Sequence, residues 1–139
     1  MTLTDADRAK FAALADRLIP AYRNMPAASA VDVQHAMLDL ALQARPELAE
    51  DFARGLAACS AETPSESINA LFRQDHAAFG AVNLMAVAAY YMTDEVRRLI
   101  GYPGQESPPY DPHETPGYLL DGSLERVVRR GPLYRPTPR

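Results

Sequence analysis

The stretch from His76 to Thr93 contains no Asp, Glu, Lys or Arg, and it constrains the fold more than any other part of the chain. Its apolar residues recur at spacings of three and four: Phe79, Val82, Ala86, Ala89 and Tyr90. This pattern predicts a helix that is buried over most of its circumference and on which other helices pack. The stretch is too short and too rich in alanine to predict a membrane span.

Helix start and stop signals divide the residues before this stretch into further helices. Thr4 and Asp7 resemble a capping box that opens a helix over residues 5–19, and Pro20 ends it. Ser29 is expected to cap a helix over residues 29–44, and Pro46 to open the next one. A second capping box, TPSE at residues 63–66, predicts another start.

Around the central helix, Asp75 is expected to cap its beginning, and Thr93 to cap a short helix over residues 94–100 with Gly101 after its end. No segment alternates apolar and polar residues as a strand does. We therefore expect a small, compact all-α domain with about five to seven helices.

The composition changes after this point, where eight of the twelve prolines occur from Pro103 onward. Residues 102–118 predict an irregular loop with Pro103-Gly104 in a type II turn, followed by a short helix over residues 123–130 and an extended tail. We expect one domain, in which residues 1–101 form the helical core and residues 102–139 form a loop, a short helix and a docking tail. Residues 119–139 carry five Arg against two acids, a local charge of +3.

Composition excludes several classes of function. A net charge of −4 argues against general nucleic-acid binding, and the single Cys59 excludes an internal disulfide. Cys59 is best interpreted as a small apolar residue near a helix end. The histidines lack metal-ligand spacing, and no nucleophile or phosphate-binding motif is present. No signal peptide is recognisable at the start, which predicts a cytoplasmic location.

The pair Tyr90-Tyr91 has two interpretations. In the favoured one, one ring packs in the core and the other covers a loop. In the other, Tyr91 and the turn at residues 101–105 present a surface to another protein, because Tyr and Arg are enriched at interface anchors. The Arg-rich tail also has two interpretations: it is a frayed terminus, or it is an arm that binds along a partner.

Three segments carry a family resemblance: LTDADRAKFAALADRLIP at residues 3–20 with MPAA at 25–28, YYMTDEVR at 90–97 with IGYPGQ at 100–105, and RGPLYRP at 130–136. In these segments the chain resembles the gluconate 2-dehydrogenase subunit 3 family, small helical subunits that accompany flavin-dependent oxidoreductases of the glucose-methanol-choline class. The resemblance implies a non-catalytic subunit without a cofactor or metal of its own. FAD and the substrate pocket would belong to the large partner, which oxidises sugars, sugar acids or alcohols.

The resemblance, together with the exposed character of these residue types, predicts a partner-binding set: Tyr91, Tyr102, Pro103, Gly104, Gln105, Tyr110, Tyr118, Arg130, Tyr134 and Arg135. Two alternatives stay open. The chain could be an assembly chaperone that releases the flavoprotein, or an independent small helical protein. Many family members start with a twin-arginine signal, which this sequence lacks, and this favours a cytoplasmic complex.

Overall fold

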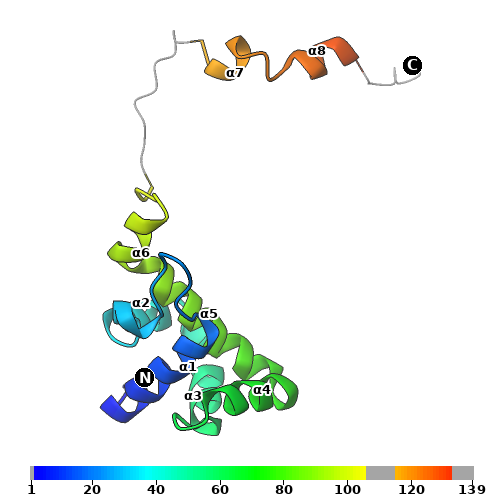
Figure 1. Ribbon diagram of the computed structural model, residues 1–139. Coiled ribbons are helices and arrows are strands. Elements are labelled where there is room, and N and C mark those ends of the chain that lie inside the picture. The colour runs from blue at the N-terminus through cyan, green and yellow to red at the C-terminus, as the bar shows by residue number, and fades with distance from the viewer. Residues whose placement is uncertain (1, 106–114, 133–139) are drawn as a thin grey trace, which may run out of the picture. The chain divides into compact units, whose positions relative to one another are not determined.

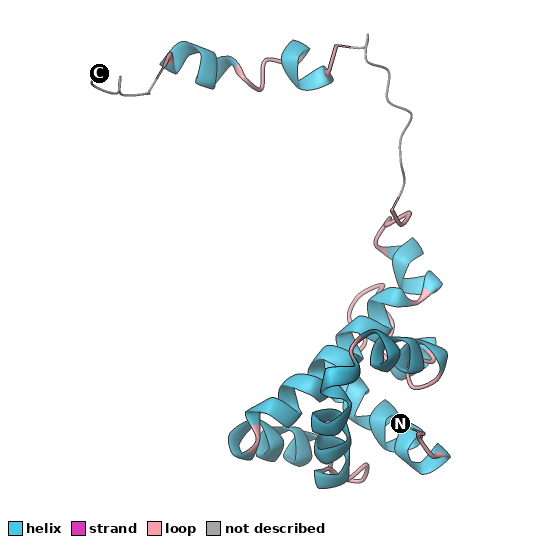
Figure 2. Ribbon diagram, turned by 180° about the vertical axis from the view of Figure 1, so that it is seen from behind, coloured by secondary structure: helices cyan, strands magenta, loops and turns pink. Residues whose placement is uncertain are grey.

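The computed structural model of the chain describes residues 2–105 and 115–132. Regular secondary structure in these two ranges is helical, apart from an isolated bridge between Tyr22 and Met25, and this confirms the all-α prediction (Figure 2). Contacts divide the chain into two compact units, residues 1–105 and 106–139.

The first unit contains six α-helices and two short 3₁₀ helices. In chain order they are α1 (Asp5–Leu18), η1 (Ser29–Val31), α2 (Ala36–Ala44), η2 (Pro46–Leu48), α3 (Ala49–Ala58), α4 (Pro64–Gln74), α5 (His76–Met92) and α6 (Asp94–Leu99). The second unit contains α7 (Gly117–Leu120) and α8 (Glu125–Arg130).

Helix α5 is the centre of the first unit, as its lack of charge predicts. The helices α1, α2, α3, α4 and α6 all contact it (Figure 1). Its buried face consists of residues spaced by three and four: Ala78, Ala81, Val82, Met85, Ala86, Ala89 and Tyr90. Small residues let a neighbour come close. A Cβ atom at Gly55 of α3 would lie 2.9 Å from Val82 Cγ2 and 3.0 Å from the Ala78 carbonyl oxygen.

One strip along α5 is open. Ala77, Gly80, Leu84 and Tyr91 are exposed on it, while Phe79 and Ala88 beside it are partly buried against the core, so the helix is wholly or partly buried over most of its circumference, as predicted. The exposed positions on this strip are small or uncharged, and a lack of charge alone does not distinguish a covered face from an open one.

The helix predicted over residues 29–44 is broken into η1 and α2. Asp32 adopts the left-handed conformation with φ +55°, which ends η1. Ser29 does not cap a helix with its side chain, because its Oγ donates to Asp16 Oδ2 at 2.6 Å and its N–H to Asp16 Oδ1 at 2.7 Å. This link to α1 holds the segment in place, and the fully buried Val33 anchors the loop that follows.

Two of the five predicted caps, those at Thr4 and Asp75, form as expected. The Asp7 N–H donates to Thr4 Oγ1 at 3.2 Å while the Thr4 N–H donates to Asp7 Oδ2 at 3.0 Å, a complete capping box. Asp75 caps α5 by accepting from the Ala78 N–H at 3.0 Å. The caps predicted at Thr63 and Thr93 are wrong, since neither side chain bonds the helix that follows it. Thr93 is buried, and its hydroxyl donates backward to the Tyr90 carbonyl at 2.8 Å.

The described part of the second unit, residues 115–132, consists of two short helices and has no buried residue. Every described residue from Thr115 to Pro132 is exposed. Local bonds hold its shape: the Ser123 N–H donates to Asp121 Oδ1 at 2.8 Å, and the Ser123 hydroxyl donates to the Tyr118 carbonyl at 3.1 Å. The helix predicted over residues 123–130 forms as α8, but α7 begins at Gly117, inside residues 102–118 where an irregular loop was expected. The predicted extended tail lies almost entirely outside the described residues.

Candidate docking site

The two tyrosines at the end of α5 have different environments, which confirms that one ring packs in the core. Tyr90 is buried, and its hydroxyl donates to the Pro26 carbonyl at 2.8 Å. Burial raises the pKa of the Tyr90 hydroxyl. Tyr91 is 51% exposed and meets the Tyr90 ring edge to face, with 5.4 Å between the ring centroids. The buried ring therefore supports the exposed one from behind.

The chain reverses direction after α6 in a Schellman motif. The Tyr102 N–H donates to the Arg97 carbonyl at 2.8 Å and the Gly101 N–H to the Arg98 carbonyl at 3.1 Å. Gly101 has φ +70°, a conformation in which a side chain would be strained, and this confirms its predicted place after the helix end. The turn that carries Tyr102 is thereby fixed to the last turn of α6.

Arg97 holds the same turn from the side. Its guanidinium carbon lies 5.7 Å from the centroid of the Tyr102 ring, within the range of a cation–π contact. Gly104 has φ +102°, as the second central residue of a type II turn requires, and a Cβ atom there would lie 2.6 Å from Arg97 Nη2. The arginine side chain therefore packs closely beside both residues of the turn.

Four large apolar side chains at this end of the first unit are exposed, and we call them the α6-end surface. Their exposed fractions are 51% for Tyr91, 40% for Leu99, 48% for Ile100 and 49% for Tyr102. Tyr91 and Tyr102 belong to the set predicted from sequence. Leu99, Ile100 and the positioning residue Arg97 were missed. The sequence did contain a signal for Leu99 and Ile100, because two apolar residues directly before a helix-ending glycine have no further helical turn to cover them.

The structure brings together only part of the predicted set. Pro103 and Gln105 are exposed in the same turn as Tyr102 and Gly104. Tyr118 and Arg130 are exposed in the second unit, on α7 and α8. The three remaining predicted residues, Tyr110, Tyr134 and Arg135, lie outside the described residues.

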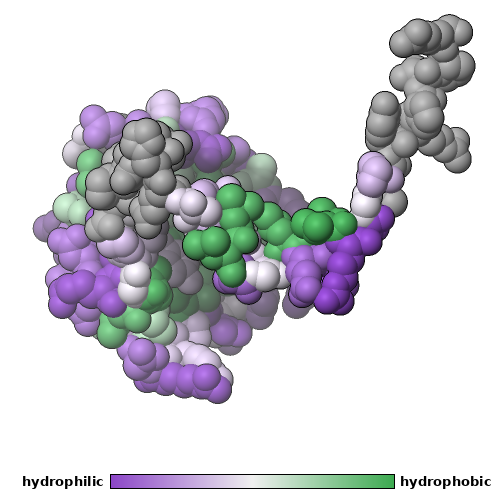
Figure 3. Space-filling view, turned by 90° about the horizontal axis from the view of Figure 1, so that it is seen from above, coloured by the Kyte–Doolittle hydropathy of each residue, from purple (hydrophilic) through white to green (hydrophobic). Residues whose placement is uncertain are grey.

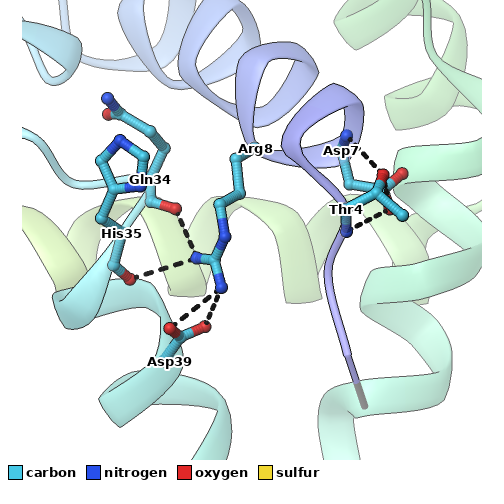
Figure 4. Close-up of polar contacts among 6 residues, drawn as sticks. All are labelled: Thr4, Asp7, Arg8, Gln34, His35 and Asp39. Carbon is cyan, nitrogen blue, oxygen red and sulfur yellow. Dashed lines mark hydrogen bonds and ion pairs between the residues drawn. The ribbon is translucent and has the colours of Figure 1, made fainter.

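A groove of about 880 Å³ lies elsewhere on the first unit, between the start of α1 and the helices α2 and α3. One wall is built by Arg8, whose Nη2 donates to both Asp39 oxygens, at 2.9 and 3.0 Å, and whose Nη1 donates to the Gln34 carbonyl at 2.8 Å (Figure 4). These bonds tie α1 to α2, so we interpret Arg8 as a structural cross-link.

Among the described residues, no group of three or more His, Cys, Asp or Glu side chains could hold a metal ion. Cys59 is buried in the core at the end of α3, as predicted, and its burial raises the pKa of the thiol. Within the same part of the chain, none of the helices has both the length and the apolar character that a bilayer crossing requires.

Comparison with known proteins does not identify the chain. No protein-family model, curated protein or solved structure matches it. The resemblance in the three quoted segments is therefore the starting point of a proposal, and the geometry of the α6-end surface supplies the argument for it.

Proposed function

We propose that this chain is a non-catalytic small subunit that binds and stabilises an FAD-dependent dehydrogenase or oxidase acting on sugars, sugar acids or related alcohols. The observation that supports it best is the α6-end surface. It lies on the segment, residues 90–105, that most specifically resembles the gluconate 2-dehydrogenase subunit 3 family. In that reading, FAD and the catalytic groups belong to the large subunit, and the complex is cytoplasmic.

The form of the surface supports a docking role. Leu99 and Ile100 offer aliphatic contact area, while Tyr91 and Tyr102 offer rings with a polar tip, a residue type enriched at interface hot spots. The turn is held by the Schellman bonds and by Arg97, so little conformational freedom is left to lose on binding. Exposed aromatic residues on a rigid support are the features expected of an anchor for a partner protein.

Co-expression with a flavoprotein of the glucose-methanol-choline class from the same genome tests the proposal. We expect the two chains to purify together in a fixed ratio, and the large subunit to be less soluble and less loaded with FAD when this chain is omitted. Ile100→Asp, which places a charge in the α6-end surface, should weaken binding by about 30-fold or more. A large subunit that is equally soluble and equally loaded without this chain would contradict the proposal.

Size-exclusion chromatography of the mature enzyme distinguishes a resident subunit from an assembly chaperone. A subunit stays with the active flavoprotein in a fixed ratio, whereas a chaperone is absent from it. The pre-organised turn favours lasting attachment, because a surface that is already ordered before binding gives slower dissociation for the same contacts.

A further inference from the structure

The second unit has an amphipathic helix whose apolar side is exposed. Leu124 has a helical backbone conformation and is followed three and four residues later by Val127 and Val128. At 3.6 residues per turn these three side chains lie on one face, which we call the α8 ridge. All three are exposed, as are the Tyr118, Leu119 and Leu120 side chains of the preceding segment.

The charged residues of α8 lie on the remaining faces and are not distributed evenly. Glu125 and Arg129 form an ion pair of 2.6 Å on one flank of the ridge. Arg126 and Arg130, four residues apart, lie on the other flank, which we call the arginine flank. Figure 3 shows the same division, with hydrophobic atoms along one side of the second unit and hydrophilic atoms along the other.

Residues 117–131 have a defined conformation although α7 and α8 do not pack on a core. Gly122 with φ +79° and Gly131 with φ +69° delimit α8, and the Ser123 bonds fix the turn before it. Short helices with no core under them are not stabilised by packing, which normally supplies most of helical stability. A ridge of three aliphatic side chains at helical spacing is the pattern that a groove on another protein recognises.

We propose that α8 is a docking arm that binds in a groove on the flavoprotein subunit. The floor of that groove is apolar and contacts the α8 ridge, and carboxylates along one edge of it face Arg126 and Arg130. This inference rests on the proposed function and adds a second attachment besides the α6-end surface. Two linked attachments raise the overall affinity above that of either one, because the second binding event takes place within the complex.

The charges favour this occupant over two others. Over the whole second unit, residues 106–139, five arginines are balanced by five acidic residues, and this net charge of zero gives a weak attraction to anionic lipid although residues 119–139 alone carry +3. A twofold dimer that pairs α8 antiparallel with its own copy would bring the two arginine flanks against each other, and these like charges repel. A single groove with an acidic edge satisfies both the ridge and the flank.

The test measures binding of the full chain to the purified flavoprotein subunit. Leu124→Ser with Val128→Ser should weaken binding by about 10- to 100-fold. Arg126→Gln with Arg130→Gln should weaken it by about 3- to 10-fold at low salt, and the difference should shrink as salt is added. Arg129→Gln, on the opposite flank, is the matched control and should bind within about twofold of the wild type. Because all five side chains are exposed, the thermal midpoint should be the same in every variant.

The outcomes separate this proposal from the proposed function. If the ridge variant binds as tightly as the wild type while Ile100→Asp loses binding, the arm is overturned and the small-subunit role stands. If the wild type does not bind the flavoprotein, both are overturned. Sedimentation showing a dimer that the ridge variant abolishes, or flotation with equimolar phosphatidylglycerol and phosphatidylcholine vesicles that depends on the ridge, would assign α8 to a second copy or to a membrane and overturn the proposal.

Discussion

Among single residues, a local sequence pattern was sufficient for some predicted caps and not for others. Thr4 with Asp7, and Asp75, cap helices through atoms only three residues away. Thr63 has a capping-box pattern of the same spacing, but its side chain does not cap α4. Thr93 is buried where α5 meets α6, so its hydroxyl bonds the Tyr90 carbonyl instead. Arg97 could not be singled out, because its role depends on the folded turn at residues 101–105.

Arg97→Ala should loosen this turn without harming the core. The substitution removes the guanidinium beside Tyr102 and Gly104, while the Schellman hydrogen bonds and the buried Val96 remain. We expect binding to the flavoprotein to weaken by about 3- to 10-fold and the thermal midpoint to change little. Titration calorimetry and a melting curve measure the two effects. Unchanged affinity would show that Arg97 does not position the turn for binding.

Asp75 gives the first unit a defined response to acid. Arg54 donates to Asp75 at 2.7 Å, and with the Ala78 N–H it lowers the pKa of the carboxyl from 3.8 to about 2. Because the folded pKa is the lower one, the stabilisation is present above 3.8 and is lost as the pH falls through about 2. Between these two pH values, the thermal midpoint should fall more steeply with decreasing pH for the wild type than for Asp75→Asn. Parallel curves would contradict the assignment.

At the scale of elements, the helices and most of their edges were predictable, and the break within residues 29–44 was not. A neutral stretch with apolar residues at spacings of three and four identified α5, and proline at the first turn identified α4. The break between η1 and α2 was missed, because it depends on Asp16, thirteen residues before Ser29. Of the predicted docking residues in the turn after α6, Tyr102, Pro103 and Gln105 are exposed and Gly104 is partly buried. Their neighbours Leu99 and Ile100 were missed, although their place directly before Gly101 was a signal for exposure.

The close contact between α3 and α5 can be tested with two glycines. In Gly55→Ala the new methyl group would lie 2.9 Å from Val82 Cγ2 and 3.0 Å from the Ala78 carbonyl, so overpacking should outweigh the better helix propensity. We expect a net loss of about 1–2 kcal/mol in the free energy of unfolding. Gly80→Ala on the open face of α5 is the control. It meets no atom within 4 Å and should gain about 0.5–1 kcal/mol.

At the scale of the whole molecule, the first unit has a core, whereas residues 115–132, the described part of the second unit, have none. The buried residues that form the core run from Phe11 to Val96, so they belong to the first unit. Ending the chain at Gln105 should therefore leave the thermal midpoint of the first unit unchanged, within the error of a calorimetric scan. The same truncation should reduce affinity for the flavoprotein if α8 is a docking arm. A lower midpoint would show that the first unit needs residues after 105 for its stability.

The exposed ridge of α8 also has a consequence for the life of the protein in a cell. Six large apolar side chains on a segment without a core resemble the surface by which chaperones and proteases recognise unfolded proteins. In the complex, the flavoprotein would cover these apolar side chains. In a copy of this chain made in excess of the flavoprotein, they would stay exposed. We expect the amount of this chain to follow the amount of flavoprotein, so that surplus copies are degraded and the two subunits reach equal numbers without matched synthesis.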